Sequence, residues 1–308
     1  MKRWLIFFAF FLIVSGTTMA EGSSEASKEA ERELKAFVSI IPQSFFVERI
    51  GEEHVEVNVL IERGKDPHTF ELTPQQMIAL TGADLFFGIG FPFEQQILRK
   101  VQSTNPHLAL IVTDKGVMRR PMDEVGIDYE RILKNSEEKD IELHGEGMLD
   151  PHIWLSPSAI RVIVKNIYEA FAKVDQENAH VYKKNLDEFL VDLEAVDARL
   201  KQLLEPYRGK SFYVFHPAFG YFTDEYGLVQ IPVEIEGKSP TPKQIETLIR
   251  RARLENIKII FVSPQFDRKS AETIAEAIGG AVISIDPLEK DVFSNLEDIA
   301  KNIKGSLR

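Results

Sequence analysis

The sequence has 308 residues, a formal net charge of −11, a hydrophobic content of 44% and no cysteine. The lack of cysteine excludes disulfide bridges, thiolate metal sites and a cysteine nucleophile, and the excess of acidic residues argues against nucleic acid or an anionic membrane surface as a partner. A chain of this length and hydrophobicity can bury one large or two medium cores without covalent cross-links.

Residues 1–20 have the pattern of a signal peptide. Two basic residues precede an apolar run from Leu5 to Val14, and small residues follow up to Ala20. The run is too short for an ordinary membrane span, so we expect an extracytoplasmic protein, with an uncleaved N-terminal anchor as the alternative. Cleavage would remove two positive charges and no negative one, which changes the formal charge from −11 to −13. The polar segment 21–35 is expected to be a flexible leader.

From Ala36 onward, short apolar strands alternate with helical segments. The predicted strands of the first half are AFVSII, HVEVNVLI, ADLFFGIG and LALIVT, and those of the second half are SFYVF, LVQIPVEI, KIIFVS and AVISI. This alternation predicts parallel sheets that are covered by helices on both faces. We therefore expect an α/β fold of two lobes, with an N-terminal lobe over 36–177 and a C-terminal lobe over 207–308.

One long helix over 178–206 is expected to join the two lobes. The span from Ser158 to Glu205 contains neither glycine nor proline. Its apolar residues from Tyr182 to Leu203 recur at steps of three and four, which is typical of an amphipathic helix. Because no glycine or proline interrupts such a helix, we expect ligand release to involve loop rearrangement or small lobe tilts rather than a large hinge motion.

The tripeptide Asp-Pro-His occurs twice and supplies His68 and His152. Proline fixes its own φ and favours extended geometry in the residue before it, so each loop presents its histidine in a defined direction. His68, His216 and Asp286 each lie just past the carboxyl end of a predicted strand, where ligand crevices form in parallel sheets. Three imidazoles and a carboxylate are ligands that zinc accepts. We therefore predict a transition-metal site between the lobes, made by His68, His152, His216 and Asp286.

Each of these residues also has a simpler interpretation. A single loop histidine is often solvated or hydrogen-bonded, and Asp286 could be a turn residue before a proline. His144 lies in the acidic segment 135–150, which is interpreted as a solvated loop, with weak cation gathering as the alternative. The other three histidines are interpreted as surface residues: His54, His107 and His180.

Motifs of common enzymes are missing from the sequence. It contains no GxxxxGK[ST] phosphate loop, no HExxH helix and no GxSxG elbow. Four protein ligands would hold a metal ion, whereas a catalytic zinc keeps one position open for water. We therefore expect a binding protein and not an enzyme, and an extracellular metallohydrolase with an open water position is the alternative.

Six motifs occur in a characteristic order: DPHTFELTP, ADLFFGIG with FPFEQQIL, DPHIWLSP, FHPAFGYF, EIEGKSPTPKQI and SIDPL. In these motifs the chain resembles, from about Ala36 to its end, the zinc-binding members of the cluster A-I (TroA-like) solute-binding proteins of ABC transporters. The resemblance implies two α/β lobes, one long connecting helix and one metal ion between the lobes. It also implies delivery of the ion to a membrane permease that a cytoplasmic ATPase powers.

Position by position, His68, His152 and His216 match the three histidine ligands of that family, and Asp286 matches its C-terminal carboxylate. Manganese-preferring relatives typically have glutamate at the third position, so the resemblance implies that His216 favours Zn²⁺ over Mn²⁺. Uptake of manganese or iron is the alternative. The histidine-rich loop of many zinc relatives is reduced here to His144. The resemblance thus implies a monomeric periplasmic zinc-uptake protein. An adhesin-like role would need a surface attachment that a signal without cysteine does not supply.

Overall fold

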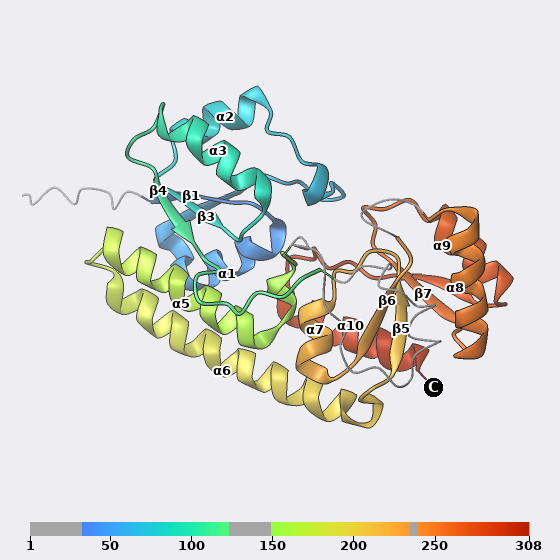
Figure 1. Cartoon of the computed structure of the whole chain (residues 1–308). Coiled ribbons are helices and arrows are strands. Elements are labelled where there is room, and N and C mark those ends of the chain that lie inside the picture. Colours follow the sequence, from blue (N-terminus) through green and yellow to red (C-terminus); the bar gives the residue numbers. More distant parts are fainter. Residues whose placement is uncertain (1–32, 123–148, 235–239, 308) are drawn as a thin grey trace, which may run out of the picture. The chain divides into compact units, whose positions relative to one another are not determined.

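The structure is a computed structural model that describes residues 33–122, 149–234 and 240–307 (Figure 1). The predicted signal peptide, the leader up to residue 32 and His144 lie outside the described residues. Within the described part of the chain, no helix is both long enough and apolar enough to cross a membrane.

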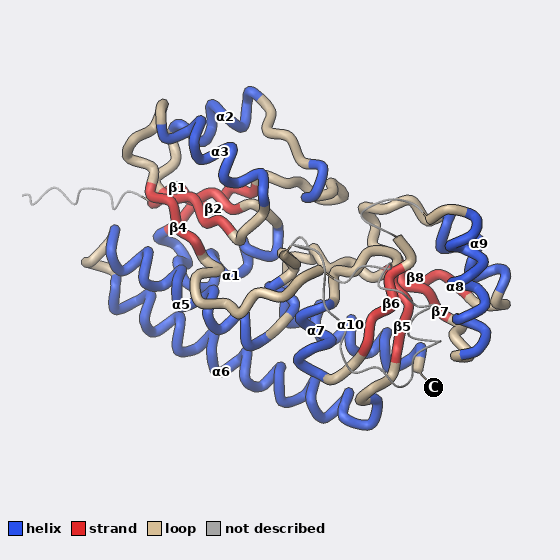
Figure 2. Tube along the Cα trace, viewed as in Figure 1, coloured by secondary structure: helices blue, strands red, loops and turns tan. Residues whose placement is uncertain are grey.

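The first sheet has four parallel strands in the order β2-β1-β3-β4. Strand β1 begins at Leu34, two residues before the predicted start at Ala36, because Leu34 already pairs with Val55 of the neighbouring strand. Helices α2 and α3 cover one face of this sheet, and α1 and α5 cover the other (Figure 2). The elements are β1 (Leu34–Val38), α1 (Ile41–Gly51), β2 (Val55–Val59), α2 (Pro74–Thr81), β3 (Leu85–Gly88), α3 (Pro92–Gln102), β4 (Ala109–Val112) and α5 (Pro157–Val174).

The second sheet repeats this plan with the strand order β6-β5-β7-β8, again all parallel. The eight strands of the two sheets match the eight strand segments that the sequence predicts, and the α/β class is confirmed. The elements are β5 (Ser211–Val214), α7 (Gly220–Tyr226), β6 (Val229–Pro232), α8 (Pro242–Leu254), β7 (Ile259–Val262), α9 (Lys269–Ala277), β8 (Ala281–Ser284) and α10 (Val292–Ser306).

Helix α6 (Ala179–Leu204) is the long helix that the sequence predicts. Its 26 residues span about 39 Å at the α-helical rise. One stripe of its surface is buried, as the spacing of its apolar residues requires, and this stripe runs from Tyr182 to Leu204. The helix packs along α5 and against α1 and α10 (Figure 1).

Aromatic side chains link the long helix to both halves of the chain. Phe189 of α6 lies with its ring centroid 6.0 Å from that of Phe45 on α1 and 4.9 Å from that of Phe293 on α10. The larger apolar core accordingly includes residues from both sheets. The chain from Glu33 onward forms one compact unit, so the division at 36–177, 178–206 and 207–308 stays a prediction.

The strand order determines where ligand-binding side chains can gather. In an open parallel sheet of this order, loops leave the sheet in opposite directions on either side of the first strand, which opens a crevice at the carboxyl ends. In the second sheet this point lies between β5 and β7. His216 follows β5 and Gln265 follows β7, so both lie at this edge.

Candidate metal centre

Three of the four predicted ligands meet at one point. Each of His68, His152 and His216 offers a ring nitrogen, and these nitrogens all lie within 4.8 Å of one another. The ring centroids are 4.9 to 5.4 Å apart. Among the described residues, this is the one group of three or more histidine or acidic side chains that could hold a metal ion.

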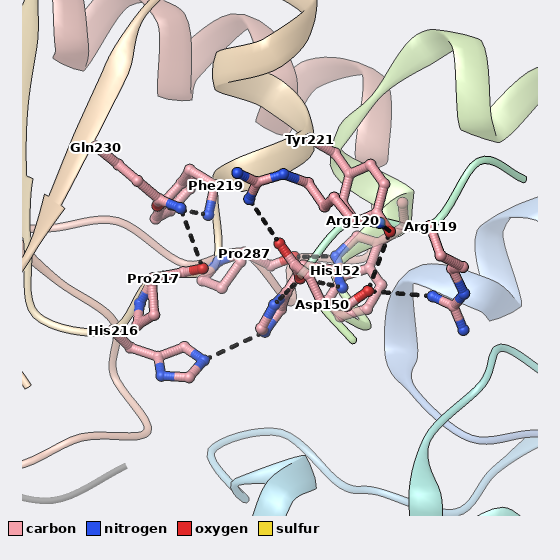
Figure 3. A network of polar contacts seen from close by, with 12 residues as sticks. Arg119, Arg120, Asp150, His152, His216, Pro217, Phe219, Tyr221, Gln230 and Pro287 are labelled. Carbon is pink, nitrogen blue, oxygen red and sulfur yellow. Dashed lines mark hydrogen bonds and ion pairs between the residues drawn. The ribbon is translucent and has the colours of Figure 1, made fainter. Parts of the chain in front are cut away.

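His152 is oriented by the aspartate of its own Asp-Pro-His loop. Oδ1 of Asp150 accepts hydrogen bonds from the backbone N–H of His152 at 2.9 Å and from its ring Nδ1 at 2.8 Å. Asp150 is fully buried, and its other oxygen pairs with the Arg120 guanidinium at 3.3 Å (Figure 3). The carboxylate can only accept, so Nδ1 carries the proton and Nε2 keeps a free lone pair.

His216 is oriented in the same way by a residue that is distant in sequence. Its Nδ1 lies 2.6 Å from Oε1 of Glu234, which is buried just past the end of β6. The ring also stacks on Phe266 at a centroid distance of 4.6 Å. The Nε2 atom of His216 is therefore also unprotonated and points towards the shared centre (Figure 3).

The spacing of these two nitrogens fits a metal ion. Nε2 of His216 lies 3.3 Å from Nε2 of His152. Two nitrogens bound to one tetrahedral zinc at about 2.0–2.1 Å would be roughly 3.3–3.4 Å apart. Two facing lone pairs repel each other unless a cation lies between them. The two Nε2 atoms are therefore placed to bind a cation.

His68 completes the group from an exposed loop. It follows β2 in a short 3-10 helix, Pro67–Thr69, whose N-cap residue is Asp66. Here Oδ1 of Asp66 accepts a hydrogen bond from the backbone N–H of His68 at 2.9 Å. The ring of His68 lies edge-on to Phe91, 6.0 Å between centroids.

The surroundings keep all three imidazoles neutral. Local desolvation lowers the pKa of His68 to about 4, although part of the residue is exposed to solvent, and repulsion from His216 is the next cause. Burial also lowers the pKa of His152 and of His216, and the hydrogen bonds to Asp150 and Glu234 oppose that change. A metal ion that binds at neutral pH therefore has no imidazole proton to displace.

Asp286, the fourth predicted ligand, is not part of this group. Its Oδ1 accepts hydrogen bonds from Nε2 of Gln265 and from the backbone N–H of Leu288, both at 2.9 Å. The loop that carries it is nevertheless fixed beside His152, because Nε1 of Trp154 donates to the Pro287 carbonyl at 2.8 Å. Direct binding by Asp286 stays a prediction.

Three further residues that shape the site were not predicted as part of it: Asp150, Glu234 and Gln265. A signal for each was present. Asp150 belongs to the repeated tripeptide, and Glu234 and Gln265 follow strand ends as His216 does. The other described histidines lie elsewhere: His107 and His180 are exposed, and His54 packs on Tyr182.

Comparison with known proteins agrees with this geometry. Residues 37–305 match the family model described as zinc-uptake complex component A, periplasmic. The chain is 28% identical over 313 residues to the high-affinity zinc uptake system protein ZnuA of Bacillus subtilis (strain 168), covering 97% of this chain and 91% of that protein.

Solved structures show the same relationship. A crystal structure of ZnuA has a TM-score of 0.80 and 36% sequence identity, covering 90% of this chain and 100% of the other. A ZnuA deletion mutant with zinc bound has a TM-score of 0.78 and 36% identity, with 90% and 98% coverage. The family model spans nearly all of the described chain, and three neutral histidines occupy one point of its fold. The chain therefore belongs to the family of periplasmic zinc-uptake components.

Proposed function

We propose that this protein captures a single Zn²⁺ ion outside the cytoplasm and delivers it to an ABC permease with its cytoplasmic ATPase. Membership of the zinc-uptake family supports this role. That family is one of transport proteins and not of enzymes. The zinc ion is thus a cargo that must be both bound and released.

The observation that carries the proposal is a small cavity at the three histidines. It has a volume of about 20 Å³, and His68, His152 and His216 all line it. A cavity of this size holds roughly one water molecule or one small ion. Neutral imidazole nitrogen is a ligand that suits zinc far better than magnesium or calcium.

His68, His152 and His216 bind the ion directly in this proposal, and Asp286 is the proposed fourth ligand. Oδ1 of Asp286 accepts a hydrogen bond from Gln265, so binding of the ion through this oxygen would weaken or break that bond. A shell of three nitrogens and one oxygen favours zinc over manganese, because affinity for nitrogen donors rises from manganese towards zinc.

Further parts of the proposal concern the whole chain. We propose that residues 1–20 are removed on secretion and that the mature protein acts as a periplasmic monomer. Mass spectrometry of protein secreted by its host would find an N-terminus at Glu21, and sedimentation would give the mass of one chain.

Zinc binding is tested with protein purified without added metal. Competition titration with a chromophoric chelator measures the affinities for Zn²⁺ and Mn²⁺ in the same buffer. We expect one zinc ion per chain, weaker manganese binding, and loss of zinc binding in His216→Ala. His107→Ala, which changes an exposed histidine, is the matched control and should bind like the native chain. Equal zinc affinity in His216→Ala and in the native chain would reject the site.

A further inference from the structure

Gln265 lies between the metal cavity and Asp286. It lines the small cavity together with the three histidines. Asp286 instead lines a separate cavity of about 370 Å³ on the far side of this contact. The hydrogen bond from Nε2 of Gln265 to Oδ1 of Asp286, at 2.9 Å, thus holds the carboxylate on the far side.

The orientation of the Gln265 amide is fixed by this contact. A carboxylate only accepts hydrogen bonds, so the NH₂ group of the amide must face Asp286 and its oxygen must face away. That oxygen, Oε1, is buried, and no donor among the described residues bonds to it. A buried polar atom without a partner destabilises the arrangement that contains it. The contact between Gln265 and Asp286 is therefore one that the protein can give up.

We propose that Gln265 competes with the metal ion for Asp286 and so sets how much this carboxylate contributes to binding. While the amide holds Oδ1, the three imidazoles dominate the site. When Asp286 moves to the ion, the amide is free to rotate, and Oε1 can find a donor such as a solvent water molecule. This inference rests on the proposed function, because it assigns a positioning role at the same site.

The restraint also bears on which metal is bound. A carboxylate oxygen is the harder ligand and suits Mn²⁺, whereas imidazole nitrogen suits Zn²⁺. By holding Asp286 back, Gln265 keeps the site rich in nitrogen. It is thus a specificity-determining residue that favours zinc over manganese, and its removal should narrow the difference between the two metals.

A double-mutant cycle tests the competition. Gln265→Met keeps the length of the side chain and removes both the donor and the acceptor, and Asp286→Ala removes the carboxylate. Zn²⁺ and Mn²⁺ affinities are measured by chelator competition for the native chain, both single variants and the double variant. We expect Asp286→Ala to weaken zinc binding about tenfold more in the Gln265→Met background than in the native one. Manganese affinity should rise in Gln265→Met only while Asp286 is present.

The outcomes separate this inference from the proposed function. An equal or smaller effect of Asp286→Ala in the Gln265→Met background would overturn the competition while leaving zinc binding by the histidines intact. A native chain that binds no zinc would overturn both. Gln75→Met, at an exposed position on α2, is the matched control for the substitution itself. If Gln265→Met fails to fold by circular dichroism, Gln265→Asn serves instead, because its amide is one methylene too short to hold Asp286.

Discussion

The two loops share the tripeptide Asp-Pro-His and contribute to one site, but they hold their histidines differently. In both, the aspartate Oδ1 accepts a hydrogen bond from the histidine backbone N–H at 2.9 Å. In the second loop the same oxygen also accepts from the ring Nδ1 of His152. In the first loop, Asp66 bonds to the backbone of His68 and, at 3.4 Å, to the Thr69 hydroxyl.

Burial accounts for the difference between the loops. Asp150 is fully buried beside Arg120, and His152 is only 4% exposed. His68 is exposed and Asp66 is half-buried. The tripeptide thus determines a local turn, whereas the tertiary surroundings decide whether its aspartate also orients the ring. One imidazole is held rigidly while the other closes the site from a loop at the surface.

Removal of each histidine in turn should have the largest effect on zinc affinity. Both His152→Ala and His68→Ala remove a ligand, so each should weaken zinc binding by more than about 100-fold, beyond the range for residues that only orient a ligand. His152→Ala should in addition destabilise the metal-free protein by about 1–3 kcal/mol, because buried Asp150 loses a donor. Chemical unfolding without metal measures this. Equal destabilisation by the two substitutions would contradict the assigned difference.

The next effect concerns the charge behind His152. Asp150→Asn keeps an oxygen for Nδ1 but removes the negative charge that makes the ring a stronger ligand. Such changes typically lower metal affinity about 10-fold or more. Zinc titration of Asp150→Asn measures the loss, and Glu234→Gln, the same change at the equivalent contact of His216, should show a similar one. An unchanged affinity in both variants would show that the carboxylates do not support the imidazoles.

The third effect is on pH dependence. An unperturbed histidine would lose zinc to protons below about pH 6. Because the folded-state pKa of all three histidines is lowered, to about 4 for His68, the neutral forms persist to lower pH, and zinc affinity should fall only at a pH below that limit. Below about pH 6.5 the unfolded chain binds protons at these histidines more readily than the folded chain does. The metal-free protein should therefore lose stability as pH falls from about 6.5 towards 4.

Nuclear magnetic resonance of the imidazole rings in the metal-free protein measures the pKa of each histidine directly. The rings of His152 and His216 should titrate below pH 6.5, and His68 should become protonated near pH 4. A midpoint near 6.5 for His152 or His216 would show that the rings are solvated rather than buried, and would remove the basis for the expected pH range.

Much of this arrangement could be predicted from the sequence, because it follows from local patterns. The alternation of strands and helices predicted both sheets, and the apolar stripe from Tyr182 to Leu203 predicted α6. The position of His216 after a strand could also be read directly. In each case the deciding interaction is a strand period, a helix stripe or a turn that lies within a few residues.

The rest depends on contacts between residues far apart in the chain. Glu234 lies 18 residues after His216, and Gln265 lies 21 residues before Asp286. No local pattern predicts that the ring of His216 contacts Glu234. None predicts that Asp286 accepts a hydrogen bond from an amide. These contacts form because the loops after β5, β6, β7 and β8 lie at the same edge of the second sheet.

The smallest effect returns to the first Asp-Pro-His loop. Asp66 caps the short 3-10 helix through Oδ1, and asparagine caps equally well. Asp66→Asn should therefore change the stability of the metal-free protein by less than about 0.5 kcal/mol. Zinc affinity should fall by less than about threefold, because Asp66 makes no hydrogen bond to a described imidazole ring and attracts the ion only through a half-exposed charge.

Asp66→Ala, which removes the cap, should cost about 1 kcal/mol of stability. Since Asp150→Asn is the same chemical change in the same tripeptide, a loss of zinc affinity as large in Asp66→Asn as in Asp150→Asn would mean that both aspartates act on the metal, and that burial does not separate the two loops.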